Sequence, residues 1–297
     1  MRQLMSTKEV AEYLRLRERK IYDLVSRDEI PHSRVSGKLL FPRAQIDQWV
    51  NAGMGNSAAA NPSRNTARAA PVIAGSHDPL LDWAVRESRC GLATLTYGSL
   101  DGIDRMVSGE ACAAAIHLPP TRDSARNIGV VSERLGHLDV VLINWARREQ
   151  GLVVAPGNPL KLKKLADLPG KQARTILRQP HAGSYLLLLQ QLAEARMTLA
   201  DLKVVKTIAQ SESDIAAAIL DGKADTGLAV RAVARQFHLD FIPVTSEQLD
   251  LAVLRRAYFD PPMQALLRFS QEKLFRDYAG EMSGYDVGEL GKVVWNA

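Results

Sequence analysis

Four serines stand where a predicted strand ends and a predicted helix begins, a position suited to anion binding. They are Ser76, Ser99, Ser184 and Ser211. The first N–H groups of a helix have no acceptor within the helix, and the helix dipole is positive at that end. A nearby hydroxyl adds another donor. The pattern therefore predicts a site for a small anion, and the alternative at each turn is an ordinarily capped helix without a ligand.

Residues beside these serines complete the predicted ligand site. From the same turns we include His77, Gly98, Arg178, Gly183 and Tyr185. Ligands in open α/β sheets bind at the carboxyl ends of the strands, where such turns lie. His77 and His181 could each donate to an anion or simply be solvated. If the ligand were organic, Tyr97 and Tyr185 would line the cleft. Glu110 and Asp225 are expected to be structural, because a carboxylate facing a bound anion would repel it.

Enzyme motifs are absent from the sequence. It contains no Gly-x-x-x-x-Gly-Lys-Ser/Thr, Gly-x-Ser-x-Gly, His-Glu-x-x-His or Cys-x-x-Cys pattern. The six histidines form no pair with the spacing of metal ligands. Cys90 and Cys112 are expected to be reduced core residues. We therefore expect neither an enzyme nor a cofactor or metal site.

A second group of residues is suited to double-stranded DNA. Arg17, Arg19, Lys20 and Tyr22 fall on the outer face of a predicted helix, and Arg34 and Lys38 fall on a predicted hairpin. Residues 1–50, which we call the head, hold ten Lys and Arg against seven Asp and Glu. The head thus carries +3 of the chain's net charge of +5, which agrees with DNA contact.

The head is predicted to contain two short helices, a hairpin and a closing helix. Glu9 has the capping-box spacing from Ser6, so a first helix should begin there. Two short helices joined by a tight turn are typical of a helix-turn-helix, and the hairpin would be its wing. The second helix is expected over 18–27 with Ile21, Leu24 and Val25 inward, the hairpin over 34–41, and the last helix over 43–50 with Ile46, Trp49 and Val50 inward.

Downstream of residue 70, short apolar strands alternate with helical stretches. Alternation of this kind predicts an α/β fold with mostly parallel strands. Strands are expected at 72–75, 92–97, 111–118, 139–144, 152–154, 175–177, 204–205, 224–229, 239–242 and 251–254, and helices at 79–89, 99–108, 184–196, 212–222 and 261–278.

The chain's 297 residues suggest two or three domains. Residues 51–70 hold seven Ala, four Asn and no aromatic residue, so this stretch is expected to be a linker between the head and a domain over 71–297. The N-terminus lacks an apolar signal segment, and no apolar run approaches the roughly 18 residues of a membrane helix. We therefore expect a cytoplasmic protein that does not contact a membrane.

The head resembles the excisionase-type winged helix-turn-helix, which is related to the MerR head. The resemblance covers the whole head and is carried by the strings 6–14, Lys20-Ile21-Tyr22, Ile30-Pro31, Gly37-Lys38 and Phe41-Pro42-Arg43. It implies a DNA-binding module. Because such heads bind paired half-sites, it also implies a homodimer.

The region 71–297 resembles the periplasmic-binding-protein-like domain found behind helix-turn-helix heads in bacterial regulators, a fold shared with molybdate- and tungstate-binding proteins. The resemblance rests on short motifs in a specific order: Gly75-Ser76-His77-Asp78, Gly98-Ser99, Gly109-Glu110, His117-Leu118, 148–152, Gly157-Asn158-Pro159, Arg178-Gln179, Gly183-Ser184 and 224–227. It implies a type II fold with lobe I over 71–147 and 247–297, lobe II over 148–246, and a ligand between them.

The third turn departs from this family. Family members often have Arg-Gln-x-Gly-Ser-Gly-Thr-Arg, whereas this chain has Tyr185 and Leu186 after Gly183-Ser184. One cationic anchor for an anion is therefore missing. Arg178 could supply charge in its place.

Together these features predict a one-component transcription regulator that senses a small anion, with molybdate or tungstate as the expected ligand. The alternatives are a sensor of a small organic ligand, an excisionase-like DNA-architectural protein whose large domain forms oligomers, and a binding or storage protein with a vestigial head. Ligand-dependent DNA affinity distinguishes the sensors from the other two.

Overall fold

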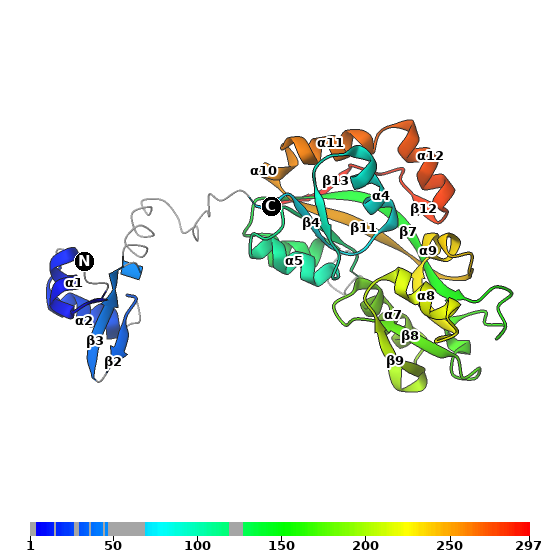
Figure 1. The fold of residues 1–297 in the computed structure, drawn as a ribbon, viewed down its shortest axis with the longest axis horizontal. Helices are drawn as coiled ribbons and strands as arrows, with labels where there is room; N and C mark the ends of the chain where they lie inside the picture. The colour runs from blue at the N-terminus through cyan, green and yellow to red at the C-terminus, as the bar shows by residue number, and fades with distance from the viewer. Residues whose placement is uncertain are drawn as a thin grey trace. The chain divides into compact units, whose positions relative to one another are not determined.

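The chain forms two compact units, Met1–Arg68 and Ala69–Ala297 (Figure 1). The computed structural model describes residues 4–14, 16–26, 30–35, 37–43, 45–46, 69–118 and 127–297. Most of the predicted linker, together with Trp49 and Val50 of the predicted closing helix, lies outside these residues. The proposed domain and lobe boundaries remain predictions.

The N-terminal unit contains the expected helix-turn-helix and wing. Helix α1 (Thr7–Leu14) is followed by α2 (Glu18–Ser26), β2 (Ser33–Val35) and β3 (Lys38–Pro42). The predicted capping box is present: the Ser6 N–H donates to Glu9 Oε2 at 2.7 Å, and the Glu9 N–H donates to Ser6 Oγ at 3.3 Å. Two side chains that meet the backbone reciprocally in this way fix where α1 begins.

A small core holds the head together. Ile21 and Leu24 of α2 are buried with Val10, Ile30, Phe41 and Ile46. Strand β1 (Leu4–Met5), which the sequence did not predict, adds to the wing and gives the sheet order β1-β3-β2. Two residues are too few to show a strand periodicity, so this element could be found only from its partner.

A ten-stranded mixed sheet runs through the large unit. Its order is β5-β4-β6-β11-β7-β10-β8-β9, with β12 and β13 pairing with β7. Strands β7 (Val140–Val154) and β11 (Asp240–Leu254) are 15 residues long and antiparallel, and they cross the whole unit. The strands and helices on either side of this pair form two lobes (Figure 1).

Lobe I is built on β4 (Val72–Gly75), β5 (Ala93–Leu95) and β6 (Ala113–Ile116). Lobe II is built on β8 (Arg174–Arg178), β9 (Lys203–Ala209) and β10 (Thr226–Val230). The helices of lobe I are α4 (Pro79–Ser88), α5 (Ser99–Val107), α6 (Asn127–Leu135), α10 (Arg255–Tyr258), α11 (Pro261–Phe269) and α12 (Lys273–Met282). Those of lobe II are α7 (Gly183–Glu194), α8 (Glu212–Leu220) and α9 (Arg231–Gln236).

Successive side chains of β7 point to opposite faces of the sheet, and each lobe has one hydrophobic core on each face. Val141 and Ile143 face a core shared with α4, α11 and α12, whereas Val140 and Leu142 face a core shared with α5 and α6. At the other end, Val153 packs with α8 and α9, and Leu152 packs with α7. Successive strand residues point to opposite faces, so helices cover both faces of the sheet and the helix starts meet where the lobes adjoin.

Several predictions of where strands and helices begin and end were wrong. The strands predicted at 139–144 and 152–154 are one strand, β7, and those at 239–242 and 251–254 are one strand, β11. The sheet is parallel within each lobe but antiparallel around the crossing pair, so "mostly parallel" was too simple. The predicted helix at 261–278 is two helices. The sequence analysis also missed α6, α9, α10, β12 (Tyr285–Asp286) and β13 (Val293–Asn296).

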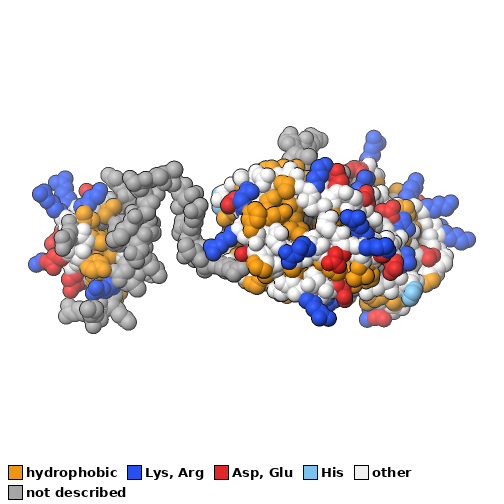
Figure 2. Space-filling view, turned by 90° about the horizontal axis from the view of Figure 1, so that it is seen from above, with side chains coloured by type: hydrophobic (Ala, Val, Ile, Leu, Met, Phe, Trp, Pro, Cys, Tyr) orange, Lys and Arg blue, Asp and Glu red, His pale blue; other side chains and the backbone are white. Residues whose placement is uncertain are grey.

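Among the helices that the structure describes, none combines the length and the hydropathy needed to cross a membrane. Figure 2 shows Lys and Arg side chains interspersed with Asp and Glu over the visible face of the large unit. A mixed surface of this kind presents no field of a single sign on that face.

Candidate functional site

Two of the four predicted turns are closed by the chain's own side chains. At the start of α4, Asp78 Oδ1 accepts a hydrogen bond from the Leu81 N–H at 2.7 Å. At the start of α8, Ser211 Oγ accepts from the Asp214 N–H at 3.1 Å, and Asp214 Oδ2 accepts from the Ser211 N–H at 2.9 Å. Asp78, Ser211 and Asp214 are therefore capping residues. Ser211 Oγ is therefore engaged in a cap.

The other two turns have no such caps, and they lie against each other. The N-cap residues of α5 and α7 are Gly98 and Ala182, and neither makes a side-chain capping bond. The Gln179 amide donates to the Tyr97 carbonyl at 2.9 Å, which ties the turn before α7 to the turn before α5. A Cβ on Gly98 would lie 2.5 Å from the His181 carbonyl oxygen, so only glycine allows this approach. Two uncapped positive helix ends from opposite lobes thus face one region.

Three of the predicted serines are buried, one in the turn before α4 and one each at the starts of α5 and α7. Ser76, Ser99 and Ser184 are 4%, 0% and 2% exposed. Ser76 Oγ lies 2.7 Å from Ser99 Oγ, and the His117 N–H donates to Ser99 Oγ at 3.1 Å. Ser184 Oγ has no hydrogen-bond partner among the described residues. A buried hydroxyl without a partner is costly, so this atom is free to bond a ligand.

Gly183 brings the two lobes together at the same place. A Cβ there would lie 2.1 Å from the His117 carbonyl oxygen and 2.7 Å from the His117 ring. The backbone of α7 therefore contacts the end of β6 directly. Any larger side chain at Gly183 would separate the lobes at the serines.

The remaining predicted ligand residues are more scattered. The buried Arg178 guanidinium donates to Gln179 Oε1 and to the Gln210 carbonyl at 3.0 Å each. Burial lowers the pKa of Arg178, although Glu212 and Asp214 oppose this effect. His77 Nε2 lies 3.4 Å from Asp82 Oδ2. Tyr185 is half-buried and His181 is exposed.

A buried charge network lies beside the serines and joins the lobes. Arg148 of β7 donates to Asp78 Oδ2 at 2.8 Å and also to Glu247 of β11. Glu247 Oε2 lies 2.7 Å from His117 Nδ1. Gln150 Nε2 then donates to Glu247 Oε1 at 3.0 Å and to Glu212 Oε1 at 3.1 Å. Hydrogen bonds therefore run without a break from the α4 cap in lobe I to α8 in lobe II.

The network keeps Glu247 and Arg148 charged. Burial acts to raise the pKa of Glu247, but His117 and Arg148 outweigh it and hold that pKa at about 2. Burial acts to lower the pKa of Arg148, but Glu247, Asp78 and Glu212 raise it well above its usual range. The Arg148 charge is thus already balanced by protein carboxylates. An anion at the serines would have to be held mainly by hydroxyl and N–H donors.

The predicted DNA-binding residues lie on the surface of the head. Arg17, Arg19, Lys20 and Tyr22 are exposed along α2 and the turn before it. Arg34 and Lys38 are exposed on the two strands of the wing, where Arg34 pairs with Leu39 and Lys38 with Val35. The structure therefore presents these six side chains to solvent around one helix and one hairpin.

Family models agree with both units. Residues 83–271 match the model of the PBP superfamily domain, and residues 4–54 match that of a helix-turn-helix domain. The first match covers well over half of the chain. The chain belongs to the PBP superfamily. The uncharacterized protein YvgK of Bacillus subtilis (strain 168) is 25% identical over 297 residues, which cover 96% of each chain.

Solved structures resemble the PBP-superfamily unit at low sequence identity. A putative phosphate transporter substrate-binding protein from Clostridium perfringens, with bound phosphate, has a TM-score of 0.53 at 12% identity and covers 75% of this chain and 98% of its own. The sulfate-binding protein SubI from Mycobacterium tuberculosis H37Rv has a TM-score of 0.52 at 16% identity, with coverage of 72% and 85%. PEB3 bound to L-phospholactate has a TM-score of 0.50 at 13% identity, with coverage of 72% and 98%. These likenesses show the fold.

Sequence reasoning missed the charge network of this PBP-superfamily unit. Arg148 and Gln150 were predicted only as part of the 148–152 motif, Glu212 belongs to the predicted turn at Ser211, and no role was predicted for Glu247. One signal was available: polar residues interrupt an otherwise apolar strand at 147–150. Partners 99 positions apart, such as Arg148 and Glu247, cannot be paired from one sequence. The expectation that Glu110 and Asp225 are structural agrees with their bonds to Arg105 and Arg174.

Proposed function

We propose that this protein is a one-component transcription regulator whose PBP-superfamily unit senses a tetrahedral oxyanion, with molybdate and tungstate as first candidates. The observation that carries the proposal is the pair of uncapped helix starts at α5 and α7, with the unpartnered hydroxyl of Ser184 between them. A bound oxyanion would accept hydrogen bonds from Ser184 and from the first N–H groups of both helices. Ser76 and Ser99 would donate to it by exchanging their present bonds to each other and to the His117 carbonyl.

The structural neighbours support the class of ligand. One of them was solved with phosphate, one is named a sulfate-binding protein, and one holds a phosphorylated acid. Phosphate, sulfate, molybdate and tungstate share tetrahedral geometry and differ in size and protonation. The ligand series in any binding experiment should therefore include all four.

Ligand binding would reach the DNA through the arrangement of the lobes. The serines belong to both lobes, so an anion held by all of them has a higher affinity for the closed arrangement. A head that binds paired half-sites requires two copies of the chain, and we propose a homodimer on DNA. The ligand would then change DNA affinity by changing how the two large units pack in the dimer.

Ligand-dependent DNA binding tests this function. Operators would be selected from random-sequence double-stranded DNA, and affinity measured by fluorescence anisotropy with and without each oxyanion. We expect at least one oxyanion to change the affinity about fivefold or more, the lower end of typical allosteric coupling. Substitution of Arg19 or Lys20 by Ala should weaken binding with or without anion. DNA affinity that no oxyanion changes would favour an architectural role.

The wing offers a second test of the DNA interface. If Lys38 contacts a phosphate, Lys38→Ala should reduce the slope of log affinity against log salt by about one. Wild-type affinity and slope in this variant, together with wild-type affinity in the α2 variants, would exclude the proposed surface.

A further inference from the structure

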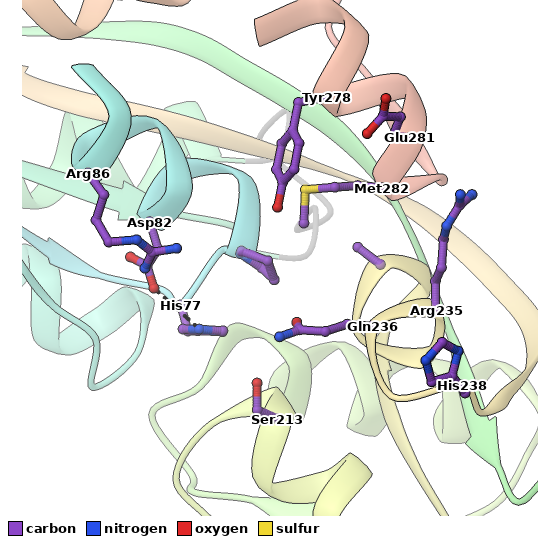
Figure 3. A pocket seen from close by; sticks show the side chains of 12 residues that line it. His77, Asp82, Arg86, Ser213, Arg235, Gln236, His238, Tyr278, Glu281 and Met282 are labelled. Atoms are coloured by element: carbon purple, nitrogen blue, oxygen red, sulfur yellow. Dashed lines mark ion pairs between the residues drawn. The ribbon is translucent and has the colours of Figure 1, made fainter. Parts of the chain in front are cut away.

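A separate pocket of about 450 Å³ opens between the lobes on another set of helices. Its walls come from α4 and α12 of lobe I and from α8 and α9 of lobe II (Figure 3). None of the serines at the α5 and α7 starts lines it. The volume falls within the range of pockets that hold organic ligands, roughly 300–1,000 Å³, whereas an inorganic oxyanion would leave most of it unfilled.

Two arginines give the pocket its cationic character. Arg86 comes from α4 and Arg235 from α9, so each lobe supplies one. Neither guanidinium forms a hydrogen bond or a close ion pair within the part of the chain that the structure describes. Burial raises the pKa of the neighbouring Asp82, and Arg86 attracts this carboxylate across the pocket wall and so acts to lower that pKa. Figure 3 shows Arg86 reaching into the pocket above His77, with Gln236 extending toward the same place from the opposite lobe. An arginine in this position can bind a carboxylate with two parallel hydrogen bonds.

The acidic residues of the pocket do not remove this character. Asp82 is paired with His77 at 3.4 Å. Burial also raises the pKa of Asp82, although His77 opposes the shift. The second carboxylate, Glu281, is exposed on α12. The pocket therefore keeps donors for an anion in Arg86, Arg235 and the Gln236 amide.

The pocket also has apolar lining. Tyr278 and Met282 point into it from α12 in Figure 3, and Pro79 and Ala232 are further apolar residues of its lining. The Tyr278 ring stacks on Trp83 at a centroid distance of 3.9 Å, which holds it in place. A rigid aromatic face offers apolar contact at little entropic cost.

We propose that this pocket binds a small organic carboxylate with an apolar body, with the carboxylate between Arg86 and Gln236 and the body against Tyr278 and Met282. The site is distinct from the proposed oxyanion site and does not depend on it. Because both lobes line it, its ligand would also favour one lobe arrangement. Binding at the two sites would then be thermodynamically coupled.

Calorimetric titration of the full-length protein with three probes tests the proposal. The probes are acetate, 3-phenylpropanoate and phenylalanine, which separate the carboxylate, the apolar body and an added ammonium. We expect saturable binding of 3-phenylpropanoate at one site per chain, with weaker binding of the other two. Arg86→Ala should weaken it about tenfold, and Arg86→Ala with Arg235→Ala should weaken it further. Thermal unfolding without ligand should stay as in the wild type, since both arginines are exposed.

Two controls make the outcome specific. Arg276→Ala removes an exposed arginine of α12 that does not line the pocket, and Ser184→Ala alters the oxyanion site; both should bind 3-phenylpropanoate as the wild type does. No saturable binding of 3-phenylpropanoate, or equal binding in the double arginine variant, would overturn the proposal. Tighter binding of phenylalanine than of 3-phenylpropanoate would also overturn it, because the pocket would then select an ammonium group, which Glu281 would bind.

Discussion

The starts of α4 and α8 differ from those of α5 and α7 in what satisfies their N–H groups. Asp78 and Ser211 cap the first pair, with donor–acceptor distances of 2.7 and 3.1 Å. Gly98 and Ala182 leave the second pair without side-chain caps, and Ser184 Oγ stays buried and unpartnered beside them. All four starts carry a nearby serine in the sequence. The difference teaches that a helix start is open to a ligand only where no protein side chain already caps it. Ser76 precedes a capped helix but stays in the proposed site, because its hydroxyl lies 2.7 Å from Ser99 Oγ at the uncapped start of α5.

The largest expected effect concerns the capped start of α4. Asp78 caps this helix and also pairs with Arg148, and both side chains are fully buried. Asp78→Ala should lower the free energy of unfolding by about 3–5 kcal/mol, because it leaves a buried charge with one partner fewer. Urea denaturation measures this loss. The matched control is Asp101→Ala, which breaks a partly exposed pair in the first turn of α5 and should cost about 1 kcal/mol or less. Equal losses in the two variants would contradict the assigned roles.

Acid should weaken the same network. The folded chain holds the pKa of Glu247 at about 2, against an ordinary value of 4.5. A lowered pKa contributes stability that is fully present above the unfolded value and is lost as pH falls through the folded value. The stability difference between wild type and Glu247→Gln should therefore be largest near neutral pH and shrink from about pH 4.5 toward pH 2. Denaturant titrations at several pH values would show this, and a pH-independent difference would refute it.

A smaller effect is expected at α8. Ser211→Ala removes one cap and should lower the free energy of unfolding by about 1 kcal/mol, without changing oxyanion binding. Ser184→Ala removes a hydroxyl that bonds nothing among the described residues, so thermal unfolding without ligand should be unchanged or slightly improved. Differential scanning calorimetry of the two variants compares the starts directly. A destabilised Ser184→Ala beside an unaffected Ser211→Ala would reverse the comparison.

Local patterns in the sequence predicted what lies within a few residues. Ser6 with Glu9 was found as expected, and Ser211 with Asp214 and Asp78 before Pro79 define their helix starts through neighbours in the same way. The ends of the strands were harder to predict. The polar residues at 147–150 looked like a break, because a strand buried on both faces reads as a continuous apolar run.

The pairing of distant groups was beyond local patterns. The buried charge of Arg148 in β7 is balanced by Asp78 and Glu247, which meet it in space. These partners are 70 and 99 positions away in the sequence, so no local pattern could reveal them. Ser76, Ser99 and Ser184 could be chosen from the sequence, but the contact of Gly183 with His117 that brings their turns together could not.

Isothermal titration calorimetry of the full-length protein with molybdate, tungstate, sulfate and phosphate tests most directly whether the uncapped helix starts bind an anion. The wild type should give saturable heat at one site per chain with at least one of these oxyanions. Ser184→Ala, and Ser76→Ala with Ser99→Ala, should each weaken that binding about tenfold or more, while Ser211→Ala should bind as the wild type does. No heat with any of the four oxyanions, or equal affinity in all variants, would contradict the account.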